Sequence, residues 1–343
     1  MDWELIFNTA LTQAFGPSVV VFALAAIGLN VQFGYTGLLN FGQAAFAAMG
    51  AYGLAIGVTI LGWPFWWSLL LGMAGAVLLA ILLGVSTLRL RADYLAIATV
   101  AAAEAIRRLF RAETMREWTG GAEGIRRFAD TFRDYGIALG LERGGTFRYG
   151  PFFYPYQPHL WVMIVGWTLI GLSVLLVWTV MRSPWGRVLK AIREDEDAVR
   201  SLGKNAFSYK IQALTLGGVF GALAGFLQGL RLGNVAPDQY HTTFTFYVYA
   251  VLILGGAARV FGPVVGAAIF WGLFNFLTAL LGEAAKLGHL PIGPLEVPVD
   301  GFLTPSQVGP FVFVLLGVGI ILMLIFRPQG IFGDRREISL NVR

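Results

Sequence analysis

The chain has 343 residues, of which 57% are hydrophobic and only 13% are charged. Charged residues make up about a quarter of an ordinary soluble domain, so a water-soluble globular protein is excluded and much of the surface must face lipid. The net charge is +5, but Lys and Arg cluster in a few loops between apolar segments, which does not indicate nucleic-acid binding. The absence of Cys excludes zinc–thiolate sites, and the three His are too scattered for a metal centre. We expect no cofactor on this chain.

The apolar segments are long enough to cross a bilayer, which takes about 20 residues of helix. They predict an all-α integral membrane protein, a single transmembrane domain over residues 1–343 with about eight to ten spans. We place these spans at residues 14–31, 42–61, 66–88, 94–110, 159–181, 211–230, 244–257, 263–283 and 309–326. Residues 3–13 mix apolar and polar side chains, which is typical of an interfacial helix.

Orientation follows from the positive charges in the short loops. Alternating the loops gathers Lys and Arg on the side of residues 89–93, 182–210, Arg259 and the C-terminal tail, which we assign to the cytoplasm. The loop at about 111–158 is then external. Its Arg residues are compatible with this placement because long loops translocate largely regardless of charge.

One predicted span has glycines at every fourth position, which places them on a single helical face. They are Gly217, Gly221, Gly225 and Gly229. Helices in lipid associate by close backbone approach over small residues, so this face predicts a packing surface for another helix.

Two glycine-rich segments, residues 34–43 and 255–263, interrupt apolar sequence where spans begin. Broken helices in matching places of two halves mark translocation sites in transporters, whereas plain loops between adjacent spans are the alternative. With the polar side chains of nearby spans, these segments supply the candidate path residues Asn40, Gly42, Gln43, Tyr94, Glu104, Gly255, Gly256 and Gly262. The polar groups at 40, 43 and 94 are equally well explained as interhelical hydrogen bonds.

Glu104 is the one acid placed clearly inside a predicted span, where ionisable residues are costly. Arg107 and Arg108 follow at three and four residues, the spacing at which side chains meet on one helix face. The sequence therefore predicts an ion pair within this helix.

The loop at residues 182–210 predicts one amphipathic helix, entered through Pro184 and Gly186 and stopped by Gly203. Its expected apolar contacts are Val188, Leu189, Ile192, Val199 and Leu202, and four consecutive acids, residues 194–197, lie in its middle. A short charged helix at the inner face suits docking of another chain, and a solvated connector is the alternative.

This loop resembles the signature G-R-x-L-x-A-I-R-E-D-E-x-A-x-x-x-L-G of the M-type permease subunits of bacterial ABC importers for branched-chain amino acids. Further motifs of the family match residues 34–46, 88–99, 119–125, 254–268 and 327–333, in the order in which they occur in the family. The resemblance therefore runs from about residue 24 to 333. The wider importer signature E-A-A-x-x-x-G survives only as Asp197-Ala198-Val199 and Gly203, which leaves the contact residues open.

The resemblance implies that the loop is the coupling helix, which docks in a cleft of a cytoplasmic ATPase. The implied contact residues are Arg187, Ala191, Arg193, Glu194, Asp195, Glu196, Ala198, Leu202 and Gly203. It also implies a transport subunit of the bacterial inner membrane, with an H-type permease, two ATPase subunits and an extracytoplasmic substrate-binding protein as partners. The chain has no phosphate-binding G-x-x-x-x-G-K-[ST] motif of its own, so ATP hydrolysis is expected in the partner chains.

The substrate and the energy source each leave an alternative. Related permeases carry urea or short amides, and residues 34–43 do not separate those cargoes from branched-chain amino acids. An ion-coupled secondary transporter is the alternative of a different class, and it would need several intramembrane acids where this chain offers Glu104.

Overall fold

The computed structural model describes residues 3–88, 92–140, 145–149, 152–156, 160–292, 295–298, 304–327 and 329–333. Most of this part of the chain is helical, as predicted. The first half contains α1 (Trp3–Ala14), α2 (Pro17–Leu29), η1 (Asn30–Tyr35), α3 (Gln43–Thr59), α4 (Phe65–Thr87), α5 (Ala92–Arg111), η2 (Glu113–Met115), α6 (Arg116–Thr119) and α7 (Asp130–Ala138). The second half contains α8 (Leu160–Arg182), α9 (Pro184–Glu194), α10 (Glu196–Ser201), α11 (Ala206–Leu232), η3 (Pro237–Tyr240), α12 (Thr242–Gly255), α13 (Gly262–Leu287) and α14 (Val308–Phe326).

Six helical stretches in the described ranges are long and apolar enough to cross a membrane. They are Ile6–Tyr35, Phe65–Thr87, Leu160–Arg182, Ala206–Leu232, Gly262–Leu287 and Val308–Phe326. Six of our nine predicted spans lie on them, and the span at 42–61 lies on the shorter apolar helix α3. The spans at 94–110 and 244–257 form α5 and α12, which do not meet both the length and the composition of a spanning helix. The fold is that of an all-α polytopic membrane protein.

The described residues contain three small strand pairs in the connections between helices, which the sequence did not predict. β1 (Ile125–Arg126) pairs with β4 (Asn234–Val235), β2 (Gly145–Tyr149) with β3 (Phe152–Tyr156), and β5 (His289–Ile292) with β6 (Leu295–Pro298), all antiparallel. The predicted long loop at 111–158 is therefore structured over its described residues, with η2, α6, α7 and three of these strands. The β1–β4 pair ties this loop to the end of α11.

Two breaks shape the N-terminal part of the chain. Gly16, with an extended backbone, and Pro17 at the first turn of α2 separate α1 from α2, since proline is tolerated only at a helix start. At its other end α2 continues into the π-helix η1, and residues 36–42 are not helical before α3 begins. The interruption predicted at residues 34–43 is thus confirmed.

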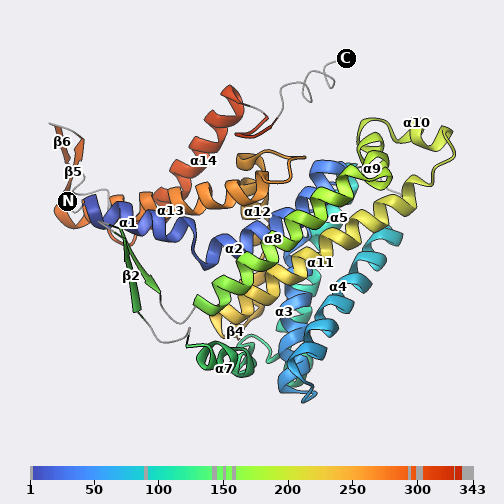
Figure 1. The fold of residues 1–343 in the computed structure, drawn as a ribbon, viewed down its shortest axis with the longest axis horizontal. Helices are drawn as coiled ribbons and strands as arrows, with labels where there is room; N and C mark the ends of the chain where they lie inside the picture. The colour runs from blue at the N-terminus through green and yellow to red at the C-terminus, as the bar shows by residue number, and fades with distance from the viewer. Residues whose placement is uncertain are drawn as a thin grey trace.

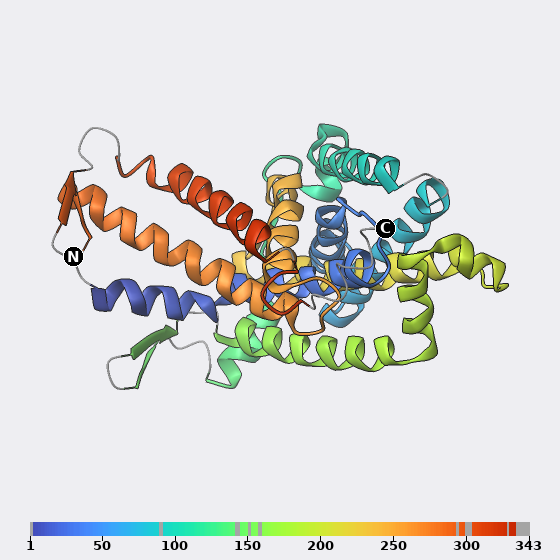
Figure 2. The same ribbon diagram turned by 90° about the horizontal axis from the view of Figure 1, so that it is seen from above.

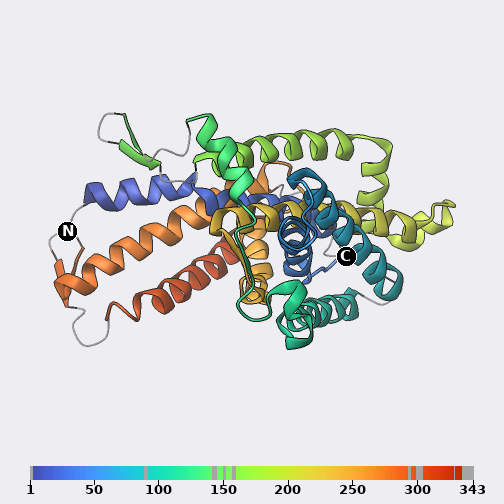
Figure 3. The same ribbon diagram turned by 90° about the horizontal axis from the view of Figure 1, so that it is seen from below.

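The core is built around α2 and α11. Every residue of α2 from Val19 to Leu29 is buried, because α8, α11, α12 and α13 all pack around this helix. In Figure 1, α2 and α11 lie in the middle of the molecule, with α3 and α4 on one side. Figures 2 and 3 show an elongated shape, in which α1, α13 and α14 extend together at one end while α9 and α10 lie at the opposite end.

Candidate coupling and translocation sites

The predicted coupling loop consists of two helices, α9 and α10, where we expected one. They meet at Asp195, whose extended backbone (φ −155°, ψ 104°) interrupts the helix. Asp195 Oδ1 accepts hydrogen bonds from the backbone N–H groups of Asp197 and Ala198, both at 2.9 Å, so this acid caps α10. The amphipathic pattern masked this capping signal because it continues on both sides of the break. Gly203 follows α10 with φ +76°.

The inner face of the loop is apolar and packed. Leu189, Ile192 and Val199 are buried, as expected, and Val188 and Ala191 are half-buried against the same core. Leu202 is different, because 81% of its surface is exposed at the end of α10. An exposed leucine on a charged helix is available to another chain.

The four consecutive acids divide into two that are held within the chain and two that face outward. Glu196 pairs with Lys210 of α11 and with Arg200 of its own helix at 2.7 Å, which holds α10 against α11. Asp195 is engaged in the cap. Glu194 and Asp197 are exposed, and Asp197 Oδ1 lies 3.5 Å from Arg200. The outward set also includes Ala198 and Arg187, whose Nη1 donates a weak 3.4 Å hydrogen bond to the carbonyl of Arg182.

Arg193 joins this loop to the broken helix. Its Nη1 donates a 2.6 Å hydrogen bond to the carbonyl oxygen of Gly34 in η1. A Cβ at Gly37 would lie 3.3 Å from Arg193 Cγ, so the two backbones approach closely, and the φ of +74° at position 37 favours glycine in any case. Sequence reasoning missed this link, because no local pattern relates residues this far apart.

An amide cluster, formed by Gln32, Asn40 and Gln43, occupies the break between η1 and α3. All three side chains are fully buried. Asn40 Nδ2 donates to Gln32 Oε1 at 2.7 Å, and Asn40 Oδ1 accepts from the N–H of Gly42 at 2.8 Å. The structure therefore brings three of the candidate path residues, Asn40, Gly42 and Gln43, together and adds Gln32, which the sequence did not single out.

The amide cluster also ties the break to the core helix α11. Gln32 Nε2 donates to the carbonyl of Leu214 at 3.0 Å, and Gln43 Nε2 donates to the carbonyls of Ala25 and Gly217 at 3.2 Å each. These amides satisfy one another and nearby backbone groups, as buried polar groups in an apolar setting have to do. In this conformation Gln43 makes interhelical hydrogen bonds, while Asn40, in the non-helical segment, bonds η1 and its own loop.

Small residues allow α11 to lie this close to its neighbours. A Cβ added at any glycine of its stripe would collide with a facing helix or loop. The nearest atoms are Gln32 Nε2 and the Gly28 carbonyl for Gly217, Gln43 Nε2 for Gly221, the Ala47 carbonyl for Gly225 and Val235 Cγ2 for Gly229. The stripe thus lies against α2, η1, α3 and β4.

The second glycine-rich segment is a tight turn between α12 and α13. A Cβ at Gly255 would lie 1.8 Å from the carbonyl oxygen of Gly262, and Gly256 has φ +103°. The segment 329–333 covers this turn, since the N–H groups of Ile331 and Phe332 donate to the carbonyls of Leu254 and Gly255 at 3.1 and 3.3 Å.

Asn30 connects the two glycine-rich segments. Its Oδ1 accepts from the N–H of Ala258 at 2.8 Å, and its Nδ2 donates to the carbonyl of Arg259 at 2.7 Å. A Cβ at Gly34 would lie 2.6 Å from the same Ala258 nitrogen. The two segments therefore touch at one place in the fold.

The remaining candidates, Tyr94 and Glu104, lie on α5, apart from the amide cluster. Tyr94 is exposed near the start of the helix. Glu104 is paired with Arg107 at 2.8 Å and Arg108 at 2.9 Å, which confirms the predicted ion pair. Arg107 also bonds Asp238 at 2.6 Å, so this network fastens the end of α5 to η3.

Comparison with known proteins agrees with this architecture. Residues 16–298 match the family described as the branched-chain amino acid transport system permease component. The chain is 31% identical over 317 residues to the high-affinity branched-chain amino acid transport system permease protein LivM of Salmonella typhimurium, covering 91% of this chain and 68% of that protein. It is 32% identical to the Escherichia coli protein of the same description, with the same coverage. A probable branched-chain amino acid transport permease protein LivM of Methanocaldococcus jannaschii is 23% identical over 93% of this chain and 92% of that protein.

The match extends over most of the chain, from α2 to β6. The protein therefore belongs to the permease component family of branched-chain amino acid transport systems.

Proposed function

We propose that this chain is the transmembrane permease subunit of an ATP-driven ABC importer for branched-chain amino acids, located in the bacterial inner membrane with its C-terminus in the cytoplasm. The match to permeases of branched-chain amino acid transport carries the proposal. The proposed complex contains an H-type permease, two cytoplasmic ATPase subunits and an extracytoplasmic substrate-binding protein. The described part of the loop at 111–158 would receive the binding protein.

The α9–α10 pair supplies a surface suited to an ATPase. It lies at one end of the elongated molecule, away from α1, α13 and α14 (Figures 2 and 3). Leu202 offers an apolar contact, while Glu194 and Asp197 offer acidic ones. Because Glu196 fixes α10 to α11 and Arg193 fixes α9 to η1, a push on this surface passes into two helices of the core.

The route of this movement ends at the amide cluster. Displacing α9 moves the Gly34 carbonyl that Arg193 holds, and residues 36–42 follow it directly. Those residues carry Asn40, whose amide bonds Gln32 and Gly42. We propose that the amide groups of Asn40 and Gln43 exchange these partners for substrate or water when the break rearranges, since broken helices build transport sites in membrane proteins.

The first experiment is uptake by the assembled complex in proteoliposomes, with ATP hydrolysis recorded in parallel. Leu202→Asp places a charge in the apolar contact, and we expect uptake to fall about tenfold or more, because a desolvated unpaired charge costs several kcal/mol. Leu202→Met, which keeps an apolar side chain of similar volume at the same exposed position, is the matched control and should transport normally. Normal uptake by Leu202→Asp would contradict the coupling assignment.

Cargo and energy source are tested in the same preparation. We expect leucine, isoleucine and valine to be taken up and urea to be excluded. Uptake should require ATP inside the vesicle, where the ATPase subunits of the inward-accumulating complexes lie. An ion gradient should not replace ATP. Uptake driven by the gradient alone would instead support the secondary transporter and direct attention to Glu104.

A further inference from the structure

A basic pocket lies where α8 and η1 end and the α12–α13 turn begins. Its cavity measures about 440 Å³, within the range of small-molecule sites. The residues on which the argument depends are Arg182, Lys190, Arg259, Tyr35, Trp178 and Phe261. We define these as the basic pocket and propose that it binds the phosphate group of an anionic phospholipid.

Three cations from three separate elements line this cavity. Arg182 is the last residue of α8, Lys190 belongs to α9, and Arg259 lies in the turn between α12 and α13. None of the described residues that line the pocket is acidic. The end of the cavity that Arg182 and Lys190 line is therefore electropositive, and an anion is the ligand that its charge favours.

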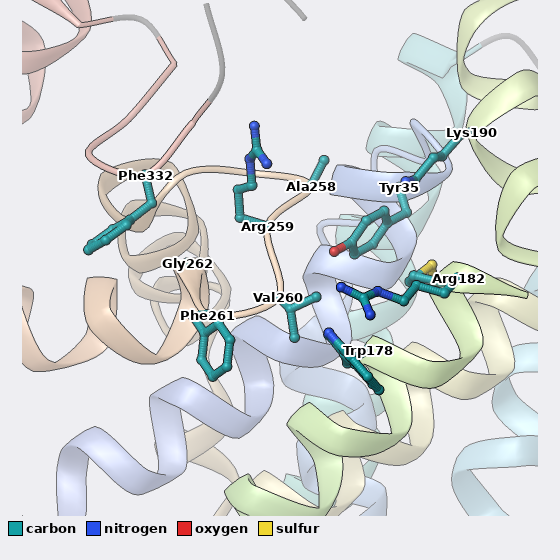
Figure 4. Close-up of a pocket in the computed structure, with 11 residues that line it drawn as sticks. Tyr35, Trp178, Arg182, Lys190, Ala258, Arg259, Val260, Phe261, Gly262 and Phe332 are labelled. Carbon is teal, nitrogen blue, oxygen red and sulfur yellow. The ribbon is translucent and has the colours of Figure 1, made fainter.

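Aromatic rings hold two of these cations in place. Arg182 Cζ lies 3.9 Å from the centre of the Trp178 ring, and Lys190 Nζ lies 5.7 Å from that of Tyr35. These are cation–π distances, which orient each charge without neutralising it. Figure 4 shows the guanidinium of Arg182 pointing into the space between Tyr35 and Trp178.

The third cation, Arg259, lies in a turn whose backbone is held in an uncommon conformation. Ala258, next to Arg259, has φ +59°, a left-handed value that is costly for any residue with a Cβ. The side-chain amide of Asn30 holds the N–H of Ala258 and the carbonyl of Arg259. Strained backbone that is held this firmly is a feature of ligand sites. Here it fixes the position from which the side chain of Arg259 extends.

The surroundings favour a lipid over a free phosphate ion. Leu172, Leu175, Trp178 and Arg182 follow one another at three- and four-residue steps along one exposed side of the apolar helix α8. Phe261 is 61% exposed at the pocket rim. In Figure 4, Trp178 and Phe261 lie on one side of the cavity, while Arg259 and Lys190 extend toward the other. An acyl chain can follow α8 while its phosphate reaches Arg182, and basic pockets between spanning helices are known to bind such headgroups.

The test is retention of phosphatidylglycerol by the purified full-length chain, measured by native mass spectrometry against phosphatidylcholine. We expect the anionic lipid to be retained preferentially. Arg182→Gln and Lys190→Gln should each reduce its retention about fivefold, the factor that a Lys or Arg near an anionic surface contributes. Arg182→Lys, which keeps the charge, should retain more lipid than Arg182→Gln.

Lys204→Gln is the matched control, because Lys204 is an exposed cation beyond α10 that does not line the pocket. Equal losses in Lys204→Gln and the pocket variants would overturn the proposal in favour of diffuse surface charge. Displacement of the lipid by inorganic phosphate at equal concentration would show a free-anion site. Unchanged lipid retention in Arg182→Gln would overturn the proposal. The inference rests on the proposed function only for which side of the membrane the pocket faces. Lipid retention is measured without transport, so the lipid site and the proposed function can each fail without the other.

Discussion

The contact between α11 and α3 allows a quantitative test of the packing. A Cβ at Gly225 would lie 1.8 Å from the carbonyl oxygen of Ala47, and 2.4 Å from its carbon. A Cβ at Gly50 would lie 2.1 Å from the Ala222 carbonyl, so the crowding is reciprocal. Non-bonded carbon contacts are ordinarily about 3.5 Å, so Gly225→Ala requires the helices to separate by more than an ångström.

The expected cost of Gly225→Ala is about 1–3 kcal/mol, the usual range for overpacking a tight core. At about 3 °C per kcal/mol for a large domain, the unfolding temperature should fall by about 3–9 °C. Thermal unfolding in detergent, followed by the intrinsic fluorescence of the ten Trp, measures this directly; a thiol-reactive dye would have no target because the chain lacks Cys.

The matched control is Gly171→Ala on α8, where nothing lies within 4 Å of the added Cβ. It should leave the unfolding temperature unchanged or raise it slightly, because alanine favours helix more than glycine. If Gly225→Ala unfolds at the temperature of Gly171→Ala, the close α11–α3 contact is not present in the membrane protein.

Two further predictions concern the break and its link to the coupling loop. Asn40→Ala leaves Gln32 Oε1 without its 2.7 Å donor and should cost about 1–3 kcal/mol in thermal unfolding, whereas Asn275→Ala, which loses one bond within its own helix, should cost less than 1 kcal/mol. Equal shifts would contradict a stabilising amide cluster. Arg193→Gln removes the 2.6 Å bond to Gly34, and leucine uptake per ATP hydrolysed should fall about tenfold, while Arg327→Gln, an exposed cation near the end of α14, should keep the wild-type ratio. An unchanged ratio in Arg193→Gln would show that coupling does not pass through this bond.

Local patterns in the sequence predicted those features that depend on local spacing. Four-residue spacing placed the glycines of α11 on one face, and three- and four-residue spacing paired Glu104 with its two arginines. Hydropathy located the spans but overstated α5, whose last turns carry too many charged residues for a span, and α12, which has only 14 residues.

Contacts between distant segments carried no such signal. Two such contacts are those of Asn30 with the α12–α13 turn and of Arg193 with Gly34. They are made by an amide and a guanidinium, which are also common on protein surfaces, so the residue types alone do not indicate a contact. The cap at Asp195 was hidden for a different reason. An aspartate inside a run of acids looks like part of a charged helix face, and only the backbone shows that the helix stops there.

These missed contacts converge on residues 30–43. Within this segment Asn30 binds the α12–α13 turn, Gln32 and Gln43 bind α11, and the Gly34 carbonyl receives Arg193 from α9. By contrast, α11 and α3 meet backbone to backbone, where closely packed helices cannot shift without collision. Under the proposed function, a displacement of α9 would therefore be absorbed at the non-helical residues 36–42, which include Asn40, and not along the α11–α3 contact. If α9 and α10 couple to an ATPase as proposed, the break that interrupts the apolar sequence is the place where a force on them would change the hydrogen bonding of buried amides.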